Sequence, residues 1–276
     1  MPSEADTIAA AQRPATVSSL VDDLDRLGLG RGDTAIVHTS LSALGWVIGG
    51  AQAVVEALLA AVGPHGTIVM PTQSGHLSDP ASWMDPPVPA EWFDAIRTEM
   101  PAFDPDVTPT RSMGAVVECF RGHRSSRRSA HPTESFAALG PNAAHIIADH
   151  RFDDGFGESS PLASLYELDA KILLLGVGHG NDTSLHLAEH RAEWTPKATE
   201  RISAPMLVDG TRAWVTAERL EPNEDDFDQI GSAMADTDIE TVGSVGAGTA
   251  RLMSMRAAVD FGVAWMSEHR PASLAN

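Results

Sequence analysis

The stretch GVGHGNDTSLHLAEHRAE at residues 176–193 contains the most informative pattern in the chain. It begins within an apolar run at residues 171–178, which is typical of a buried strand in an α/β sheet. The N-cap residue types at 181–183 then predict the start of a helix, whose apolar residues recur at i, i+3 and i+7. The neighbouring face of this helix would carry His186, Glu189, His190 and Glu193.

His186 is the first candidate for catalysis, because ligands in α/β proteins bind beyond the carboxyl ends of the strands. Imidazole titrates near neutrality, which suits a general base. Glu218, at the acidic end of a predicted strand, would orient the ring. The alternative is a core histidine that is satisfied by a backbone carbonyl.

A second candidate site follows the first predicted strand of the sheet. His38 ends this strand, and the hydroxyls of Thr39 and Ser40 would hold a phosphate or a carbonyl oxygen together with loop amides. A strand end with a simple polar turn is the alternative. The glycines within residues 176–180 do not form a dinucleotide fingerprint, because Asn181 occupies the place of the third glycine.

The string HLAEH at residues 186–190 matches the HxxEH pattern of zinc hydrolases. In that pattern two histidines hold the metal and the glutamate acts as the base. The match fixes only three positions, so a zinc-dependent hydrolase is an alternative, which sensitivity to chelators would identify.

The composition predicts a globular protein, since 43% of the 276 residues are hydrophobic and 21% are charged. No apolar run approaches the roughly 20 residues that span a bilayer. Glu4 and Asp6 lie where a secretory signal would carry positive charge. The single cysteine, Cys119, excludes an internal disulfide and agrees with a reducing compartment. We therefore expect a cytoplasmic protein with one domain over residues 1–276.

The formal net charge of −19 bears on the choice of partner. Such a field repels nucleic acid and anionic lipid, so we expect neither a nucleic-acid partner nor a membrane partner. It attracts cations, which favours a cationic substrate. The alternative is that the acidity serves solubility alone.

The order of patterns predicts an α/β fold. A helix at 16–28 precedes a strand at 34–38, a polar loop, a helix at 51–62 and a strand at 67–71, which indicates parallel strands. We expect a central, mostly parallel or mixed sheet flanked by helices on both sides. Residues 72–110 hold seven prolines and are expected to form a loop-rich insertion and part of the substrate cleft.

The remaining elements are predicted by the same patterns. Residues 135–139 are ambiguous, and Asp209 and Gly210 indicate the turn of a hairpin. We expect helices at 113–120, 143–150, 223–235 and 251–269, a short helix ending near 168, and strands at 127–131, 203–208 and 213–218.

Six collinear segments resemble one known family, the aminoglycoside 3-N-acetyltransferases or antibiotic N-acetyltransferases. Together they span most of residues 16–235. The segments are VHTSLSALG (37–45), GPHGTIVMPTQSG (63–75), FDPDVTPTRSMGAV (103–116), RRSAHPTESFAALGP (127–141), DDGFGESSPLASL (153–165) and LLLGVGHGNDTSLHLAEH (173–190).

This resemblance implies transfer of an acetyl group from acetyl-CoA to the 3-amino group of a 2-deoxystreptamine aminoglycoside, an activity that gives antibiotic resistance. It implies a non-metal enzyme, whose HxxEH string is a family feature. An alkyl ammonium has a pKa of about 9 to 10 by analogy with lysine and must lose a proton before it attacks. We expect His186 to take that proton, oriented by Glu218. The transfer would be direct, without a role for Cys119.

The binding residues are expected to come from several of these segments. Arg111 and loop amides would offset the negative phosphates of CoA. Acetyl-CoA would be bound by His38, Thr39, Ser40, Gly45, Val47, Ser74, Ser112, Met113 and Ser129. The cationic sugar would be bound by Asp79, Asp154, Glu158, Asp182 and Glu189. A non-catalytic binder of cationic sugars is a further alternative, and either a monomer or a homodimer is compatible with the sequence.

Overall fold

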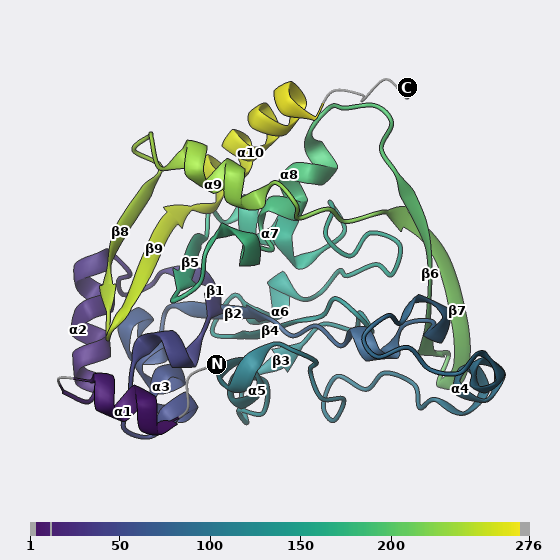
Figure 1. Cartoon of the computed structure of the whole chain (residues 1–276), viewed down its shortest axis with the longest axis horizontal. Coiled ribbons are helices and arrows are strands. Elements are labelled where there is room, and N and C mark those ends of the chain that lie inside the picture. The colour runs from purple at the N-terminus through teal and green to yellow at the C-terminus, as the bar shows by residue number, and fades with distance from the viewer. Residues whose placement is uncertain (1–3, 12, 271–276) are drawn as a thin grey trace.

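A seven-stranded sheet and a separate two-stranded hairpin organise the structure (Figure 1). The computed structural model describes residues 4–11 and 13–270. The strands are β1 (Thr34–Thr39), β2 (Thr67–Pro71), β3 (Arg127–Arg128), β4 (Phe136–Leu139), β5 (Lys171–Leu175), β6 (Thr199–Val208), β7 (Thr211–Leu220), β8 (Glu240–Val245) and β9 (Gly248–Ser254).

Ten α-helices are found in the described residues, and none of them has the length and apolar character to cross a membrane. They are α1 (Glu4–Ala10), α2 (Val17–Leu27), α3 (Gly50–Val62), α4 (Phe93–Glu99), α5 (Gly114–Arg121), α6 (Ala143–Ile146), α7 (Pro161–Glu167), α8 (Leu185–Arg191), α9 (Phe227–Met234) and α10 (Met255–His269).

The sheet is mixed, with a parallel centre and antiparallel edges. Its strand order is β3-β4-β2-β1-β5-β9-β8. Strand β1 pairs in parallel with both β2 and β5, whereas the outer pairs are antiparallel. The predicted α/β class and the parallel relation of the first two strands are therefore confirmed.

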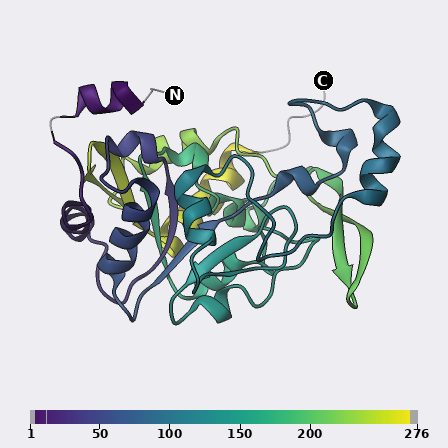
Figure 2. The ribbon, with the colours of Figure 1, turned by 90° about the horizontal axis from the view of Figure 1, so that it is seen from below.

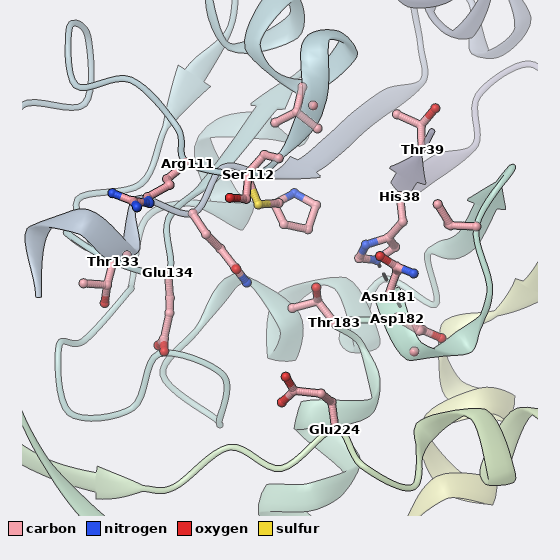
Figure 3. A pocket seen from close by; sticks show the side chains of 18 of the residues that line it. His38, Thr39, Arg111, Ser112, Thr133, Glu134, Asn181, Asp182, Thr183 and Glu224 are labelled. Carbon is pink, nitrogen blue, oxygen red and sulfur yellow. Dashed lines mark ion pairs between the residues drawn. The ribbon is translucent and has the colours of Figure 1, made fainter. Parts of the chain in front are cut away.

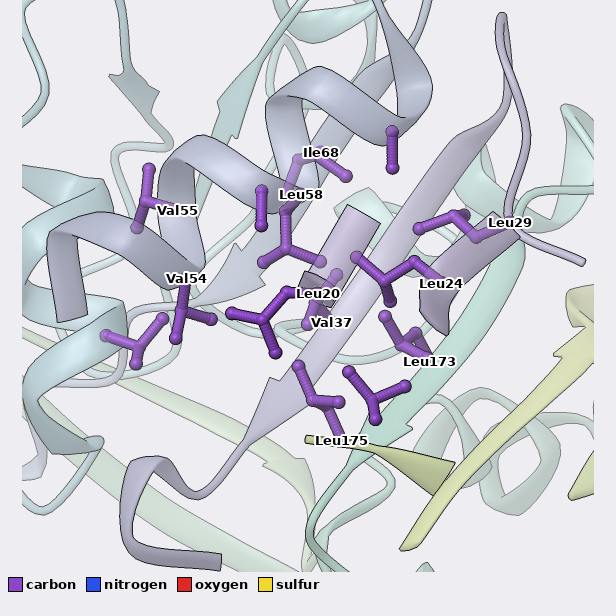
Figure 4. Packing of buried hydrophobic residues seen from close by; sticks show 14 of the residues in the cluster. Leu20, Leu24, Leu29, Val37, Val54, Val55, Leu58, Ile68, Leu173 and Leu175 are labelled. Atoms are coloured by element: carbon purple, nitrogen blue, oxygen red, sulfur yellow. The ribbon is translucent and has the colours of Figure 1, made fainter. Parts of the chain in front are cut away.

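Two hydrophobic cores lie on the two faces of the sheet, because successive strand residues point to opposite sides. In β1, Val37 faces the core that α2, α3 and α5 cover, and Ile36 faces the core under α7, α8 and α10. Figure 4 shows Leu20 of α2 and Leu58 of α3 packed over Val37 and Leu173. The expectation that helices flank both faces is confirmed.

Local signals in the sequence set several element boundaries. Thr16 caps α2 by accepting a hydrogen bond from Ser19 N, and Gly28 ends the helix with a φ of 106°. Asp209 and Gly210 both have positive φ between β6 and β7, as a tight hairpin turn requires. Both elements agree with their predictions.

The prediction of a helix over 251–269 is wrong at its start, because residues 251–254 belong to strand β9. Leu252 and Met253 point into the two different cores, which is the alternation of a strand. Backbone pairing with β5 on one side and β8 on the other stabilises that strand. The ambiguous segment 135–139 forms β4, and the helix expected at 143–150 ends at Ile146.

The loop-rich segment 72–110 packs against the hairpin β6–β7 at one end of the molecule, with α4 beside the hairpin (Figures 1 and 2). Phe103 N donates to Pro205 O over 3.0 Å, and Arg212 Nε donates to Met100 O over 2.8 Å. These bonds hold the segment and the hairpin together above the carboxyl edge of the central strands.

The close approach of α10 to α8 gives a test of the packing beneath the site. A Cβ on Gly262 would lie 2.9 Å from Ala188 Cβ and 3.2 Å from Leu185 Cδ2. We expect Gly262→Leu to lower the free energy of unfolding by about 1–3 kcal/mol through overpacking, measured by urea denaturation. Ala264→Leu on the exposed side of the same helix is the control and should change it little. Equal stability of both variants would contradict the tight contact.

Candidate active site

A cavity of about 1370 Å³ lies where the parallel strands end. Its walls come from the residues after β1, β2 and β5, from the insertion, and from both strands of the hairpin. Figure 3 shows His38 and Asp182 at one side of this space and Glu134 and Arg111 at the other. The carboxyl edge of a parallel sheet is the expected place for such a site.

His186 lines this cavity from the first turn of α8. Its side chain is 10% exposed, and its Nδ1 lies 2.9 Å from Glu189 Oε2. The ring stacks on Phe156 at a centroid distance of 4.6 Å and meets the edge of Phe227 at 4.9 Å. The ring is thus fixed in orientation by a carboxylate and two aromatic walls, and the alternative with a backbone carbonyl partner is not what the structure shows.

The acid that holds His186 is Glu189, so the expectation for Glu218 is corrected. Residues three apart on a helix share a face, which brings Glu189 to the imidazole. Strand alternation places Glu218 on the opposite side of β7 from Arg219, and Glu218 is exposed. Glu189 itself is 1% exposed and accepts hydrogen bonds from Arg270 Nη1 at 2.6 Å and Asn223 N at 3.0 Å.

His38 and Asp182 form a second buried pair beside the cavity. His38 Nε2 lies 3.9 Å from Asp182 Oδ1, and this oxygen accepts a hydrogen bond from Ser184 N at 3.0 Å. Burial lowers the pKa of His38, and the nearby Asp182 carboxylate opposes that shift only in part. His38 Nε2, Thr39 Oγ1 and Asp182 Oδ2 have no hydrogen-bond partner within the described part of the chain. Buried polar atoms of this kind fit a polar ligand.

Most of the expected acetyl-CoA residues line the cavity, but Ser74 and Ser129 do not. Ser74 Oγ donates to Pro132 O over 2.7 Å, and Ser129 Oγ lies 2.8 Å from His150 Nδ1. Both hydroxyls are buried in the protein interior and serve its own hydrogen bonds, so these two expectations are corrected. The expected residues that line the cavity are His38, Thr39, Ser40, Gly45, Val47, Ser112 and Met113.

The acids expected to bind the sugar are only partly placed at the cavity. Asp79 and Asp182 line it, whereas Asp154, Glu158 and Glu189 lie outside its described lining. The last three each have a protein partner. Asp154 lies 3.4 Å from His190, Glu158 accepts from Arg191 over 2.6 Å, and Glu189 contacts the His186 ring. Burial alone would raise the pKa of Asp79. The two hydrogen bonds from Arg97, one from Ala81 N and the charges of Arg97 and Arg201 together outweigh burial and lower this pKa.

Several lining residues were missed because they come together only in the folded chain. Glu134 is buried and forms an ion pair with Arg219, whose Nε also donates to Glu200 at 2.9 Å. Burial lowers the pKa of Arg219 to about 10. Glu224 also lines the cavity, and no interaction of its carboxylate is found among the described residues. The HPTES string around Glu134 was a signal, but no local pattern linked it to Arg219.

The HxxEH residues are not arranged as a metal site. His186 is bonded to Glu189, while His190 turns to Asp154. The described residues contain no group of three or more His, Cys, Asp or Glu side chains that could hold a metal ion. The donor geometry therefore suits an imidazole whose ring a carboxylate orients.

An α/β sheet with an oriented imidazole beside a large cavity at its carboxyl edge is suited to acid–base group transfer. The family model described as aminoglycoside 3-N-acetyltransferase matches residues 36–267. The chain belongs to this family of transferases. The HxxEH string accordingly lies in a transferase and not in a zinc hydrolase family.

Known proteins resemble the chain over nearly its whole length. The SPbeta prophage-derived aminoglycoside N(3')-acetyltransferase-like protein YokD of Bacillus subtilis (strain 168) is 46% identical over 91% of this chain and 92% of its own. Its crystal structure has a TM-score of 0.93. AAC-IIIb, solved as a binary complex with CoASH, is 32% identical, with a TM-score of 0.83 and coverage of 96% and 100% of the two chains. AAC-VIa, solved with sisomicin, is 34% identical, with a TM-score of 0.84 and coverage of 93% and 98%.

The Glu134–Arg219 ion pair allows a test of the cavity wall. Replacement of Arg219 by Met leaves a buried carboxylate without a cation, so we expect Arg219→Met to lower the free energy of unfolding by about 3 kcal/mol. Adding Glu134→Gln removes that charge and should restore most of the loss. Chemical denaturation of the wild type, both single variants and the double variant gives the coupling energy. Additive effects of the two substitutions would contradict the pair.

Proposed function

We propose that this protein transfers the acetyl group of acetyl-CoA to the 3-amino group of a 2-deoxystreptamine aminoglycoside. The observation that carries the proposal is the His186–Glu189 pair on the wall of a large cavity in a chain of this family. Relatives solved with CoASH and with sisomicin support the choice of the two substrates. Residues 1–276 would act as one domain, with 72–110 as part of the acceptor wall.

His186 is the proposed general base. The acceptor ammonium gives a proton to the imidazole, which becomes an imidazolium beside the Glu189 carboxylate. The free amine then attacks the thioester carbonyl, the C–N bond forms and the C–S bond breaks. The attacking nitrogen loses its second proton, the leaving sulfur takes up that proton to become the thiol, and the imidazolium releases its proton to solvent. Cys119 on α5 lies outside the described cavity lining, which supports direct transfer without an acyl-enzyme.

The loop after β1 is the proposed site of the acetyl-CoA thioester end. Thr39 and Ser40 line the cavity beside His38, and hydroxyl or amide donors there would stabilise the oxyanion that forms on attack. Ser112 and Met113 line it from the other side, just before α5. Arg111, also in the lining, supplies a positive charge for the phosphates in an otherwise acidic protein.

Glu224 and Asp182 are the proposed anchors for acceptor ammonium groups. Both line the cavity, and Figure 3 shows the Glu224 carboxylate directed into it. Asp79 and Glu134 also line it, but Arg97 and Arg219 already neutralise them. Glu224 has no cation partner among the described residues, and Asp182 faces only the imidazoles of His38 and His179, each at 3.9 Å, so an ammonium gains most at these two carboxylates.

The catalytic assignment is tested with His186→Gln. We expect turnover to fall by a factor of about 100 or more, because the acceptor amine is no longer deprotonated in place. Release of CoA thiol is followed spectroscopically, and mass spectrometry of an aminoglycoside panel reports whether one acetyl group is added and where. Glu193→Gln, an exposed acid just beyond the same helix, is the control.

Undiminished turnover in His186→Gln would remove the proposed base. Stoichiometric binding of the aminoglycoside, with no acetylated product in any combination, would instead indicate a non-catalytic binder of cationic sugars. Loss of turnover in Glu218→Gln but not in Glu189→Gln would contradict the pairing that the structure supports.

The acceptor assignment is tested with Glu224→Gln. Loss of a charged hydrogen bond to the acceptor should raise KM for the aminoglycoside by about ten-fold while KM for acetyl-CoA stays nearly constant. Asp225→Asn removes a neighbouring exposed acid outside the described lining and is the matched control. Steady-state kinetics with each substrate varied in turn would show the difference, and equal effects of the two variants would contradict a specific contact.

A further inference from the structure

The C-terminal end of α10 reaches the carboxylate that holds the candidate base. Arg270 directly follows this helix and donates from Nη1 to Glu189 Oε1 over 2.6 Å. Its remaining donors bind the Asp226 carboxylate and, over 2.8 Å, Asn223 O. The Arg270 side chain is 12% exposed, and its guanidinium lies over the Trp194 ring at 5.1 Å, so its position is fixed on several sides.

His186, Glu189 and Arg270 therefore form a continuous series of contacts leading away from the cavity. The two oxygens of the Glu189 carboxylate have separate roles. Oε2 meets the imidazole at 2.9 Å, whereas Oε1 accepts from the guanidinium and from Asn223 N. Because Glu189 is almost completely buried, water cannot replace either contact.

We propose that Arg270 is a positioning residue for the acetyl-transfer reaction, which fixes the Glu189 carboxylate and moderates its attraction for the proton on His186. The role of Arg270 in catalysis rests on the proposed function. Its effect on the proton of His186 does not, because that effect exists in the protein without substrates. Arg270 acts through Glu189 and does not itself line the described cavity.

The physical reason is that a buried carboxylate with no cation would bind the imidazolium too strongly. A base must release its proton after each turnover, so an imidazole that stays protonated near pH 7 is inactive. The guanidinium on the far oxygen draws part of the negative charge away from His186. Burial opposes the charged form of Arg270, but its hydrogen bonds to Asp226 and Glu189 outweigh this and raise its pKa, so the cation persists.

Other charged and titratable groups also lie close to this series. Lys197 donates to the backbone oxygens of Glu189 and His190, at 3.2 and 2.8 Å, and does not touch the carboxylate. Asp226 shares the Arg270 guanidinium. The groups that act electrostatically on one or more members of the series are His38, His190, Lys197 and Asp226.

The test is an NMR titration of His186 in protein with ring-labelled histidine, without substrates, the resonance being assigned from its loss in His186→Gln. Arg270→Gln removes a positive charge, which favours the imidazolium, so the pKa of His186 should rise by about one unit. Glu189→Gln removes a negative charge and should lower it. The acid limb of the kcat/KM profile should move in the same directions.

Two further variants separate this role from a purely structural one. Arg270→Lys keeps the charge with a single donor group and should cause a smaller rise than Arg270→Gln. Arg256→Gln removes an exposed arginine at the other end of α10 and should leave the titration unchanged.

An unchanged or lowered pKa of His186 in Arg270→Gln would overturn the proposal. If Arg270→Gln does not fold, an unchanged or lowered pKa of His186 in Arg270→Lys, compared with the lowering in Glu189→Gln, would overturn the proposal instead. Opposite shifts in Arg270→Gln and Glu189→Gln, in a protein that makes no acetylated aminoglycoside, would leave the electrostatic series standing and reject the proposed function.

Discussion

A buried carboxylate needs donors on both of its oxygens, and this requirement at Glu189 assembles the site. Donors come from His186 on the same helix, from Asn223 before α9, and from Arg270 after α10. Three chain segments are thus fixed around one side chain, at the point where one core of the sheet meets the cavity. Removing one donor would leave the buried Glu189 carboxylate partly unpaired, which costs folding free energy. The three contacts therefore depend on one another.

The sheet determines where this assembly stands. Parallel pairing of β1 with β2 and β5 brings three carboxyl ends to one edge, so the polar residues that follow them converge. His38 leaves β1 and Asp182 leaves the turn after β5, and they meet beside the cavity. The two helical layers bury both faces of the strands, which leaves the strand ends as the natural opening for ligands. The hairpin and the segment 72–110 then wall this opening.

Sequence patterns predicted the elements whose signals are local. The helix α2, the strands β1, β2 and β5, and the turn at Asp209 and Gly210 each carry their own periodicity, cap or turn residues. Residues 251–254 could not be assigned in this way, because β9 exists through pairing with distant strands. The polar cluster on α8 was predicted by spacing, yet its internal pairing was not. Glu218 was expected to orient His186, because spacing alone does not reveal which acid contacts the imidazole.

Binding residues were predicted less well for a related reason. A serine or an acid in a family-like segment does not reveal whether its partner is a ligand or the protein itself. Ser129 bonds His150, and Glu158 bonds Arg191, through contacts that only the folded chain creates. Glu134 and Arg219 show the reverse case, in which residues from distant segments form one wall of the cavity. Tertiary pairing therefore decides which of these chemically equivalent residues are bound within the protein and which can bind a ligand.

For ligand recognition, the division of the acids into those paired within the protein and those that face the cavity matters more than the total charge of −19. Several acids carry no information about the ligand, because arginines neutralise them, as Arg97 does for Asp79 and Arg219 for Glu134. Asp182 and Glu224 both line the cavity, the first fully buried and the second exposed. Salt screens an exposed carboxylate far more than a buried one. A cationic acceptor would therefore be drawn in through a salt-sensitive contact at Glu224 and held through a salt-resistant one at Asp182, next to the imidazoles of His38 and His179.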